Sequence, residues 1–184
     1  MKIRSHVLMS LILFGVVSVA QAVTPLAPDK DRILQALNGV CGWALAHPGS
    51  GLEADRSRLD PFLAPALIAD FEQAKAAEAE YVKAATPGEK PEFLEGDLIV
   101  GSVEGATEVA LGEPRIDGAH AQVEVTAIHI DERFPKASRN RVVVWTNIVE
   151  LERVGHVWHV SDVRYHGDPK QRLSTTLREY AAGR

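Results

Sequence analysis

The sequence predicts an α+β domain in which amino-terminal helices pack on a curved antiparallel sheet, with a short helix at the carboxyl terminus. Apolar residues recur with helical spacing up to about Ala85, and from Glu92 onward they recur with the two-residue spacing of strands. Turns containing glycine, at Asp117-Gly118 and at Gly155, join consecutive strands, which must therefore run antiparallel. Such a sheet is stable when helices cover one of its faces, and this requirement predicts the α+β class.

The first helix is expected to begin at Asp29 or Asp31, either of which can cap it, and to end near Ala46, before His47-Pro48-Gly49. Its apolar stripe has regular helical spacing and consists of Ile33, Leu34, Leu37, Val40, Cys41, Ala44 and Leu45. Cys41 is the only cysteine, so the chain has no intrachain disulfide, and its place in the stripe predicts a small buried side chain. A catalytic thiol is the alternative, but the nearest histidine, His47, lies on another face of this helix.

Residues Leu52 to Ala85 are also predicted to be helical, with a break caused by two prolines. Because the residue before a proline disfavours helix, Pro61 and Pro65 predict a short helix, a bend, and then a long helix with Pro65 in its first turn. The inner stripe of the long helix is expected to comprise Leu67, Ile68, Phe71, Ala74, Glu78, Tyr81 and Val82. A loop over residues 86–91 ends this helix.

The second half of the chain predicts four strands in an antiparallel meander, preceded by a short extended piece and followed by a helix. The extended piece is Asp97–Ser102, and the strands are Thr107–Ile116, Ala119–Ile130 and the two arms of a hairpin from Asn140 to Tyr165. The hairpin turns at Arg153-Val154-Gly155-His156, where Gly155 supplies the positive φ that the turn needs. The last helix is expected from Pro169 to about Ala182, with Leu173 and Leu177 facing the body.

The first 22 residues have the pattern of a signal peptide. Lys2 and Arg4 give a positive start, an apolar run from Val7 to Ala20 follows, and Ala20-Gln21-Ala22 supplies the small residues of a cleavage site between Ala22 and Val23. An uncleaved anchor is the alternative interpretation. We expect residues 23–184 to form one exported domain, periplasmic or secreted, with no integral membrane segment after cleavage.

Charge and motifs exclude several classes of partner. The net charge of −5 at pH 7, with no basic patch, argues against nucleic acid or an anionic membrane surface. No cofactor is predicted, because the chain lacks a glycine-rich phosphate loop. No metal site is predicted either, since His156 and His159 would lie on opposite faces of a strand, while His129 with Asp131 offers only two ligands.

Two segments carry a family resemblance. Helices followed by a curved antiparallel sheet whose last strand carries a Trp158-x-Val160 motif resemble the nuclear transport factor 2-like (SnoaL-like) cone fold, and the two segments are Phe62-Leu63-Ala64-Pro65-Ala66-Leu67 and Gly155 to Tyr165. More narrowly, they resemble a secreted bacterial family catalogued as domain of unknown function 3828, of which some members are immunity proteins against type VI secreted amidases. The resemblance implies a cone with an apolar interior, which is a natural ligand site. Of the family's sequence pattern after the long helix, this chain keeps only Asp97. Asp97 is therefore a candidate ligand-binding residue.

Within such a cone, the sharpest candidate pair is Asp162 with His129. Asp162 alternates in step with Trp158 and Val160, so it is expected to face inward, where burial would raise its pKa and suit it to general acid–base work. The structural alternative is that Asp162 caps a backbone segment or pairs with an arginine such as Arg141. His129 is predicted to share the inward face of Ala121, Val123, Val125 and Ala127. Trp158, Trp145, Asn147 and Tyr81 are further candidates for the ligand-binding wall.

These observations leave three functional hypotheses. The leading one is an exported, non-enzymatic binding module for a small ligand or a protein partner. The second is an immunity protein that inhibits a periplasmic amidase through an acidic loop, at Asp131-Glu132-Arg133 or at Glu89–Glu95. The third is a cofactor-free isomerase or dehydratase that uses Asp162 and His129. By analogy with the fold, a homodimer is also expected.

Overall fold

The computed structural model describes residues 28–52, 54–86, 94 and 96–183. The predicted signal peptide and its cleavage site therefore lie outside the described residues, as does most of the 86–91 loop. The α-helices of the described chain are α1 (Asp29–Ala46), α2 (Pro65–Ala84) and α3 (Leu173–Ala181), and a 3-10 turn, η1 (Asp60–Phe62), precedes α2. In this part of the chain, no helix has both the length and the apolar character needed to cross a membrane.

An antiparallel sheet of five strands accompanies these helices, so the predicted α+β class is confirmed. The strands are β1 (Glu108–Leu111), β2 (Arg115–Asp117), β3 (His120–Ile130), β4 (Val142–Val154) and β5 (Val157–Arg164). Their order is β1-β3-β4-β5, and β2 also pairs with β3. The single strand expected at Thr107–Ile116 is thus two short ones, separated at 112–114, where Pro114 has no N–H to donate to a neighbouring strand.

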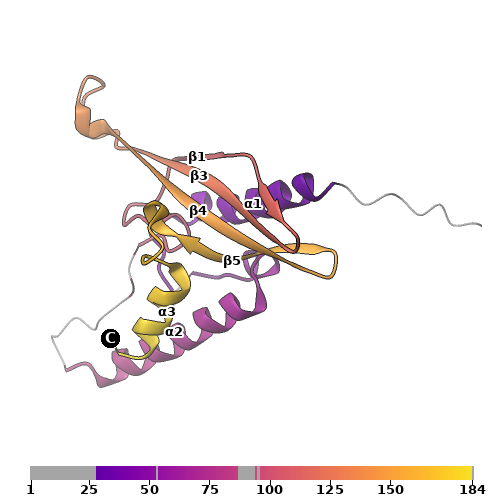
Figure 1. The fold of residues 1–184 in the computed structure, drawn as a ribbon. Coiled ribbons are helices and arrows are strands. Elements are labelled where there is room, and N and C mark those ends of the chain that lie inside the picture. The colour runs from indigo at the N-terminus through magenta and orange to yellow at the C-terminus, as the bar shows by residue number, and fades with distance from the viewer. Residues whose placement is uncertain (1–27, 53, 87–93, 95, 184) are drawn as a thin grey trace, which may run out of the picture.

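Helix α1 packs against β1 and β5, while α2 and α3 lie side by side beneath β5 (Figure 1). The core between them is formed by buried side chains from every layer: Ile33, Leu37, Val40, Leu67, Phe71, Val123, Val125, Val149, Leu151, Trp158, Val160, Val163, Leu173 and Leu177. Both predicted helical stripes are largely confirmed. The exceptions are Leu45 in the last turn of α1, at 37% exposed, and Val82, at 48% exposed, where the last turns of α2 extend away from the sheet (Figure 1).

The predicted hairpin at the end of the chain is confirmed, but β5 contains an irregularity where a regular strand was predicted. Gly155 has φ 63° at its turn, as expected. Leu151 pairs with Val160, whereas its neighbour Glu150 pairs with Asp162, so Ser161 is an extra residue in β5. Beyond this bulge, residues of β5 that a regular strand would place on the core face lie on the opposite face, and the reverse.

The exchange of faces overturns one prediction directly. Val163, opposite Val149, takes the core face that Trp158 and Val160 occupy earlier in β5. Asp162 pairs with Glu150 on the opposite face, where the residues before α3 cover it. The expectation that Asp162 faces inward with Trp158 is therefore wrong.

Two further boundaries differ from those expected. Helix α3 begins at Leu173, four residues after Pro169, although Leu173 and Leu177 are buried as predicted. Asp97–Ser102 is a tight turn, because one Asp97 carboxylate oxygen, Oδ1, accepts the N–H groups of Ile99 and Val100 at 2.9 and 3.0 Å. A side chain that bonds its own backbone in this way competes with strand formation.

Candidate functional site

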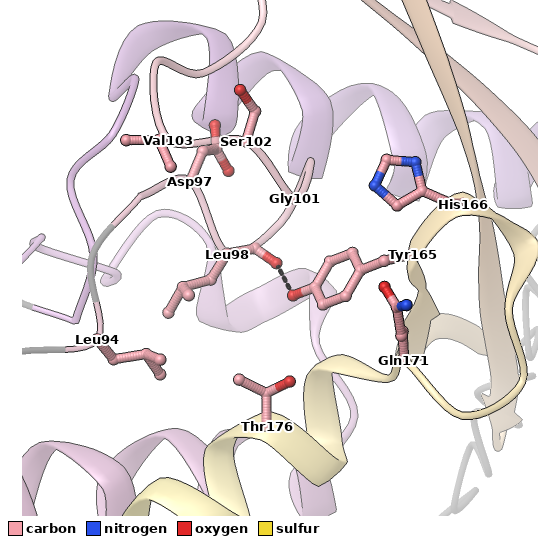
Figure 2. Close-up of a pocket in the computed structure, with 10 residues that line it drawn as sticks. All are labelled: Leu94, Asp97, Leu98, Gly101, Ser102, Val103, Tyr165, His166, Gln171 and Thr176. Carbon is pink, nitrogen blue, oxygen red and sulfur yellow. Dashed lines mark hydrogen bonds between the residues drawn. The ribbon is translucent and has the colours of Figure 1, made fainter.

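The 97–105 segment borders two adjoining hollows. The first, here called the loop hollow, has a volume of about 250 Å³, and Figure 2 shows the side chains around it. It is lined by Leu94, Asp97, Leu98, Gly101, Ser102, Val103, Tyr165, His166, Gln171 and Thr176. The second, here called the side hollow, has a volume of about 190 Å³. It is lined by Gly101, Ser102, Glu104, His129, Val143, Trp145 and His166.

The turn that follows Asp97 is held against the end of β5 by Tyr165. The Tyr165 hydroxyl donates to the Leu98 carbonyl at 2.5 Å, which leaves the face of its ring as an apolar wall (Figure 2). Gly101 makes this approach possible, since a Cβ there would lie 2.6 Å from Tyr165 Cδ1. Gly101 also has φ +71°, a conformation that side chains disfavour, so the position requires glycine on two counts.

A second tie joins the turn to β4. The side chains of Trp145 and Asn147 both donate to the Val100 carbonyl, at 2.6 and 2.7 Å. Asn147 also accepts the backbone N–H of His166 at 3.0 Å. His166 has φ 53°, so Asn147 helps to hold a left-handed residue at the wall that the two hollows share. Asn147 itself is buried and structural, whereas Trp145 lines the side hollow.

Asp97 is the unusual group of the loop hollow. It is 4% exposed, and its Oδ2 is buried without a hydrogen-bond partner among the described residues. Burial raises the pKa of Asp97 to about 6, although the N–H groups of Val100 and Ile99 act to lower it. Neither lysine nor arginine is among the described residues that line either hollow. Arg56 borders Asp97 only across a separate void of about 10 Å³ and is paired with Asp60 and Glu72, so among the described residues the Asp97 carboxylate has no basic partner.

Asp162, by contrast, is engaged in the structure around α3. It accepts hydrogen bonds from the Arg172 guanidinium at 2.8 Å, the Ser174 hydroxyl at 2.6 Å and the Ser174 N–H at 3.0 Å. Burial opposes ionisation, but the hydrogen bonds from Ser174 and Arg172 outweigh it and lower the pKa of Asp162. Asp162 thus follows the structural alternative, in which it caps a backbone segment and pairs with an arginine. That arginine is Arg172 and not Arg141, whose guanidinium donates to the Phe134 carbonyl.

The proposed pair of His129 with Asp162 is wrong. The register places His129 opposite Val143 and Asp162 opposite Glu150, seven residues further along β4. An odd separation puts the two side chains on opposite faces of the sheet, and their partner positions on β4 are about 23 Å apart along the strand at about 3.3 Å per residue. His129 does lie on the predicted face, and its Nδ1 is 3.0 Å from the Gly105 carbonyl oxygen. It lines the side hollow without Asp162.

Trp158 and Tyr81 also have structural partners. Trp158 is 2% exposed, and its indole N–H donates to Asp29 Oδ1 at 2.9 Å; this bond is the first of several effects that lower the pKa of Asp29. Asp29 thus anchors β5 and does not cap α1 through its side chain. Trp158 borders a different hollow, beside Phe62 and Arg32. Tyr81 donates to the Tyr180 carbonyl at 2.8 Å and joins α2 to α3.

Metal and thiol chemistry find no support in the part of the chain that the structure describes. Among those residues, no group of three or more histidine, cysteine, aspartate or glutamate side chains is placed to hold a metal ion. Cys41 is buried as predicted, and burial, assisted by the charge of Asp97, raises the pKa of its thiol to about 12. A thiol with this pKa is protonated at neutral pH and is a poor nucleophile.

Sequence reasoning found three residues of the two hollows, namely Asp97, His129 and Trp145, and missed the rest. The lining residues that were missed include Tyr165 and His166, which follow β5, Gln171, which precedes α3, and Thr176 in the first turn of α3. Only tertiary structure brings them to the 97–105 segment. One local signal was available: Gly96, Gly101 and Gly105 flank Asp97 and all have positive φ. Closely spaced glycines are typical of a backbone that another segment approaches closely.

Comparison of the chain with protein-family models, with curated proteins and with solved structures found no match. The resemblance to the nuclear transport factor 2-like fold and to domain of unknown function 3828 therefore stays a prediction.

Proposed function

We propose that this protein is an exported binding module that takes a small molecule in the loop hollow. The observation that carries the proposal is the Asp97 carboxylate, which lines the hollow with one buried oxygen unpartnered among the described residues. Buried polar groups are almost always hydrogen-bonded, and a charged one without a partner costs stability. A ligand that supplies the missing donor would recover that cost. Export rests on the leader pattern of residues 1–22.

The side chains that line the hollow offer a ligand apolar, anionic and polar contacts on different sides. Leu98 and the Tyr165 ring form an apolar wall, and Asp97 is the anionic group. Gln171, just before α3, and Thr176, in the first turn of α3, add polar groups. This combination of an apolar wall with a few polar groups is typical of small-molecule sites.

The proposed relation to the cone fold is supported by the order of elements. Helices α1 and α2 precede an antiparallel sheet, and β5 carries the Trp158-x-Val160 motif on its core face. The deep interior behind Trp158 is filled by buried side chains of the core. The hollow that we propose as the ligand site is therefore at the loop end of the sheet.

A fragment screen on the full chain tests the proposal. Ligand-observed NMR should detect small molecules whose binding is lost when Gln171→Trp blocks the rim of the loop hollow. Gln122→Trp is the matched control, because Gln122 is exposed on β3 and remote from the lining residues. Binding that survives Gln171→Trp, or is lost equally in both variants, would contradict the proposed site.

The immunity hypothesis stays a prediction. Of its two candidate loops, Glu89–Glu95 falls mostly outside the described residues, and in the other Asp131 is paired with Arg133 at 2.6 Å. That pair reduces the negative charge available to a partner enzyme. Co-purification with a periplasmic amidase is the measurement that would support it.

Homodimerisation is also proposed, and the open edge of β4 favours it. Val142, Val143 and Val144 are 47%, 53% and 57% exposed, and pairing with β5 begins only at Ile148. An exposed, unpaired strand edge of this kind readily pairs with another strand. Sedimentation velocity should show a dimer that Val143→Lys dissociates; a wild-type monomer would count against it.

A further inference from the structure

We infer that the ligand of the loop hollow is a small organic cation, with an ammonium group beside Asp97 and a short apolar body against Leu98 and Tyr165. This inference rests on the proposed function and specifies its ligand class. Oδ1 of Asp97 already accepts two backbone N–H groups, so Oδ2 is the oxygen that remains for a donor; because Oδ2 is fully buried, the ammonium group reaches it only if the 97–105 turn shifts.

The charges around the site favour a cation over an anion. Asp97 in the loop hollow and Glu104 in the side hollow are both acidic, and the described lining of the two hollows includes no lysine or arginine. The remaining titratable groups of these linings are His129, His166 and Tyr165. Burial and the nearby charge of Asp97 raise the pKa of the Tyr165 hydroxyl. An anionic ligand would add a second negative charge at short range, whereas an ammonium group would neutralise the first.

The volume limits the size of the ligand. A space of about 250 Å³ corresponds to roughly eight water molecules at about 30 Å³ each. A molecule of similar extent, such as the benzylammonium ion, matches this space and carries both the ammonium group and an apolar ring. An aromatic body also suits a wall made of Leu98 and the ring of Tyr165.

The test compares three ligands of nearly the same shape on the full chain by isothermal titration calorimetry: benzylammonium, benzyl alcohol and benzoate. Because a charge-assisted hydrogen bond is about twice as strong as a neutral one, benzylammonium should bind roughly tenfold more tightly than the alcohol, and benzoate should bind most weakly. If the alcohol or benzoate binds as tightly as the ammonium ion, the cation inference fails while the hollow remains a binding site. If Gln171→Trp changes the binding of none of them, the proposed function itself fails.

Asp97→Asn supplies the residue-level test. The variant keeps an acceptor for the Ile99 and Val100 N–H groups but removes the charge, so benzylammonium should bind about tenfold more weakly and the preference over the alcohol should disappear. Asp117→Asn removes one carboxylate from exposed β2 and should leave the affinities unchanged. An unaltered preference in Asp97→Asn would overturn the inference. Should Asp97→Asn fail to fold, the ligand series on the wild-type chain still decides the question.

Discussion

The unpaired carboxylate of Asp97 leads to a quantitative prediction about stability and pH. Burial raises its pKa from 3.8 to about 6 in the folded chain, a difference of about two units, or about 3 kcal/mol at about 1.4 kcal/mol per unit. Between these two pH values the folded state binds more protons than the unfolded state. The contribution of Asp97 to the free energy of unfolding therefore falls as pH rises through this window and is constant above it.

Asp97→Asn isolates this contribution, because asparagine does not titrate. The wild type should lose up to about 3 kcal/mol relative to the variant between pH 4 and pH 7, and the variant should be the more stable protein at pH 7. Subtracting the two curves removes the opposite effect of carboxylates such as Asp131 and Asp162, whose lowered pKa values make them lose stabilising interactions on acidification.

The assay is urea denaturation of both proteins at several pH values from 4.5 to 7.5, with Asp117→Asn as the control for loss of an exposed carboxylate. A wild-type-minus-variant difference that is constant with pH would show that Asp97 is solvated or paired in solution. A difference that grows with pH would mean that a cationic partner stabilises the ionised form. Either result would refute the claim that Asp97 is a buried carboxylate without a partner.

Three further predictions concern the supports of the site. Arg172→Ala leaves Asp162 without its guanidinium and Glu150 with only that of Arg164, and should cost at least about 2 kcal/mol in urea denaturation, whereas Lys170→Ala at an exposed position should cost little. Gly101→Ala should cost roughly 1–3 kcal/mol more than Gly118→Ala, because both have positive φ but only Gly101 faces the Tyr165 ring; equal costs would contradict that packing. Cys41 should react with a thiol reagent only after unfolding, and rapid labelling of native protein would contradict its burial.

The elements predicted well are those with a strong local signal. Periodic apolar residues predicted α1, the position of Pro65 predicted the start of α2, and Gly155 predicted the hairpin turn. Each of these features depends on residues within a few positions of one another. The sequence alone was sufficient for the fold class because the two long helices precede all the strands and only the short α3 follows them.

The candidate site was predicted less well, because it depends on tertiary contacts. Val160-Ser161-Asp162-Val163 places two polar residues between two apolar ones, which breaks the alternation of a regular strand and was a local signal for the bulge that the prediction of a regular strand overlooked. The bulge sends Asp162 toward Arg172 instead of toward the core. The apolar run Leu98-Ile99-Val100 suggested a strand, although the Asp97 side chain folds it into a turn. The pairing of distant segments also decides which of the predicted residues share a hollow.

The most direct measurement of the central claim is a crystal structure of the full chain with benzylammonium. We expect the ligand in the loop hollow, with its nitrogen about 2.7–3.2 Å from Asp97 Oδ2 and its ring against Tyr165. A benzylammonium ion found elsewhere, or one in the hollow whose nitrogen points away from Asp97, would contradict the account.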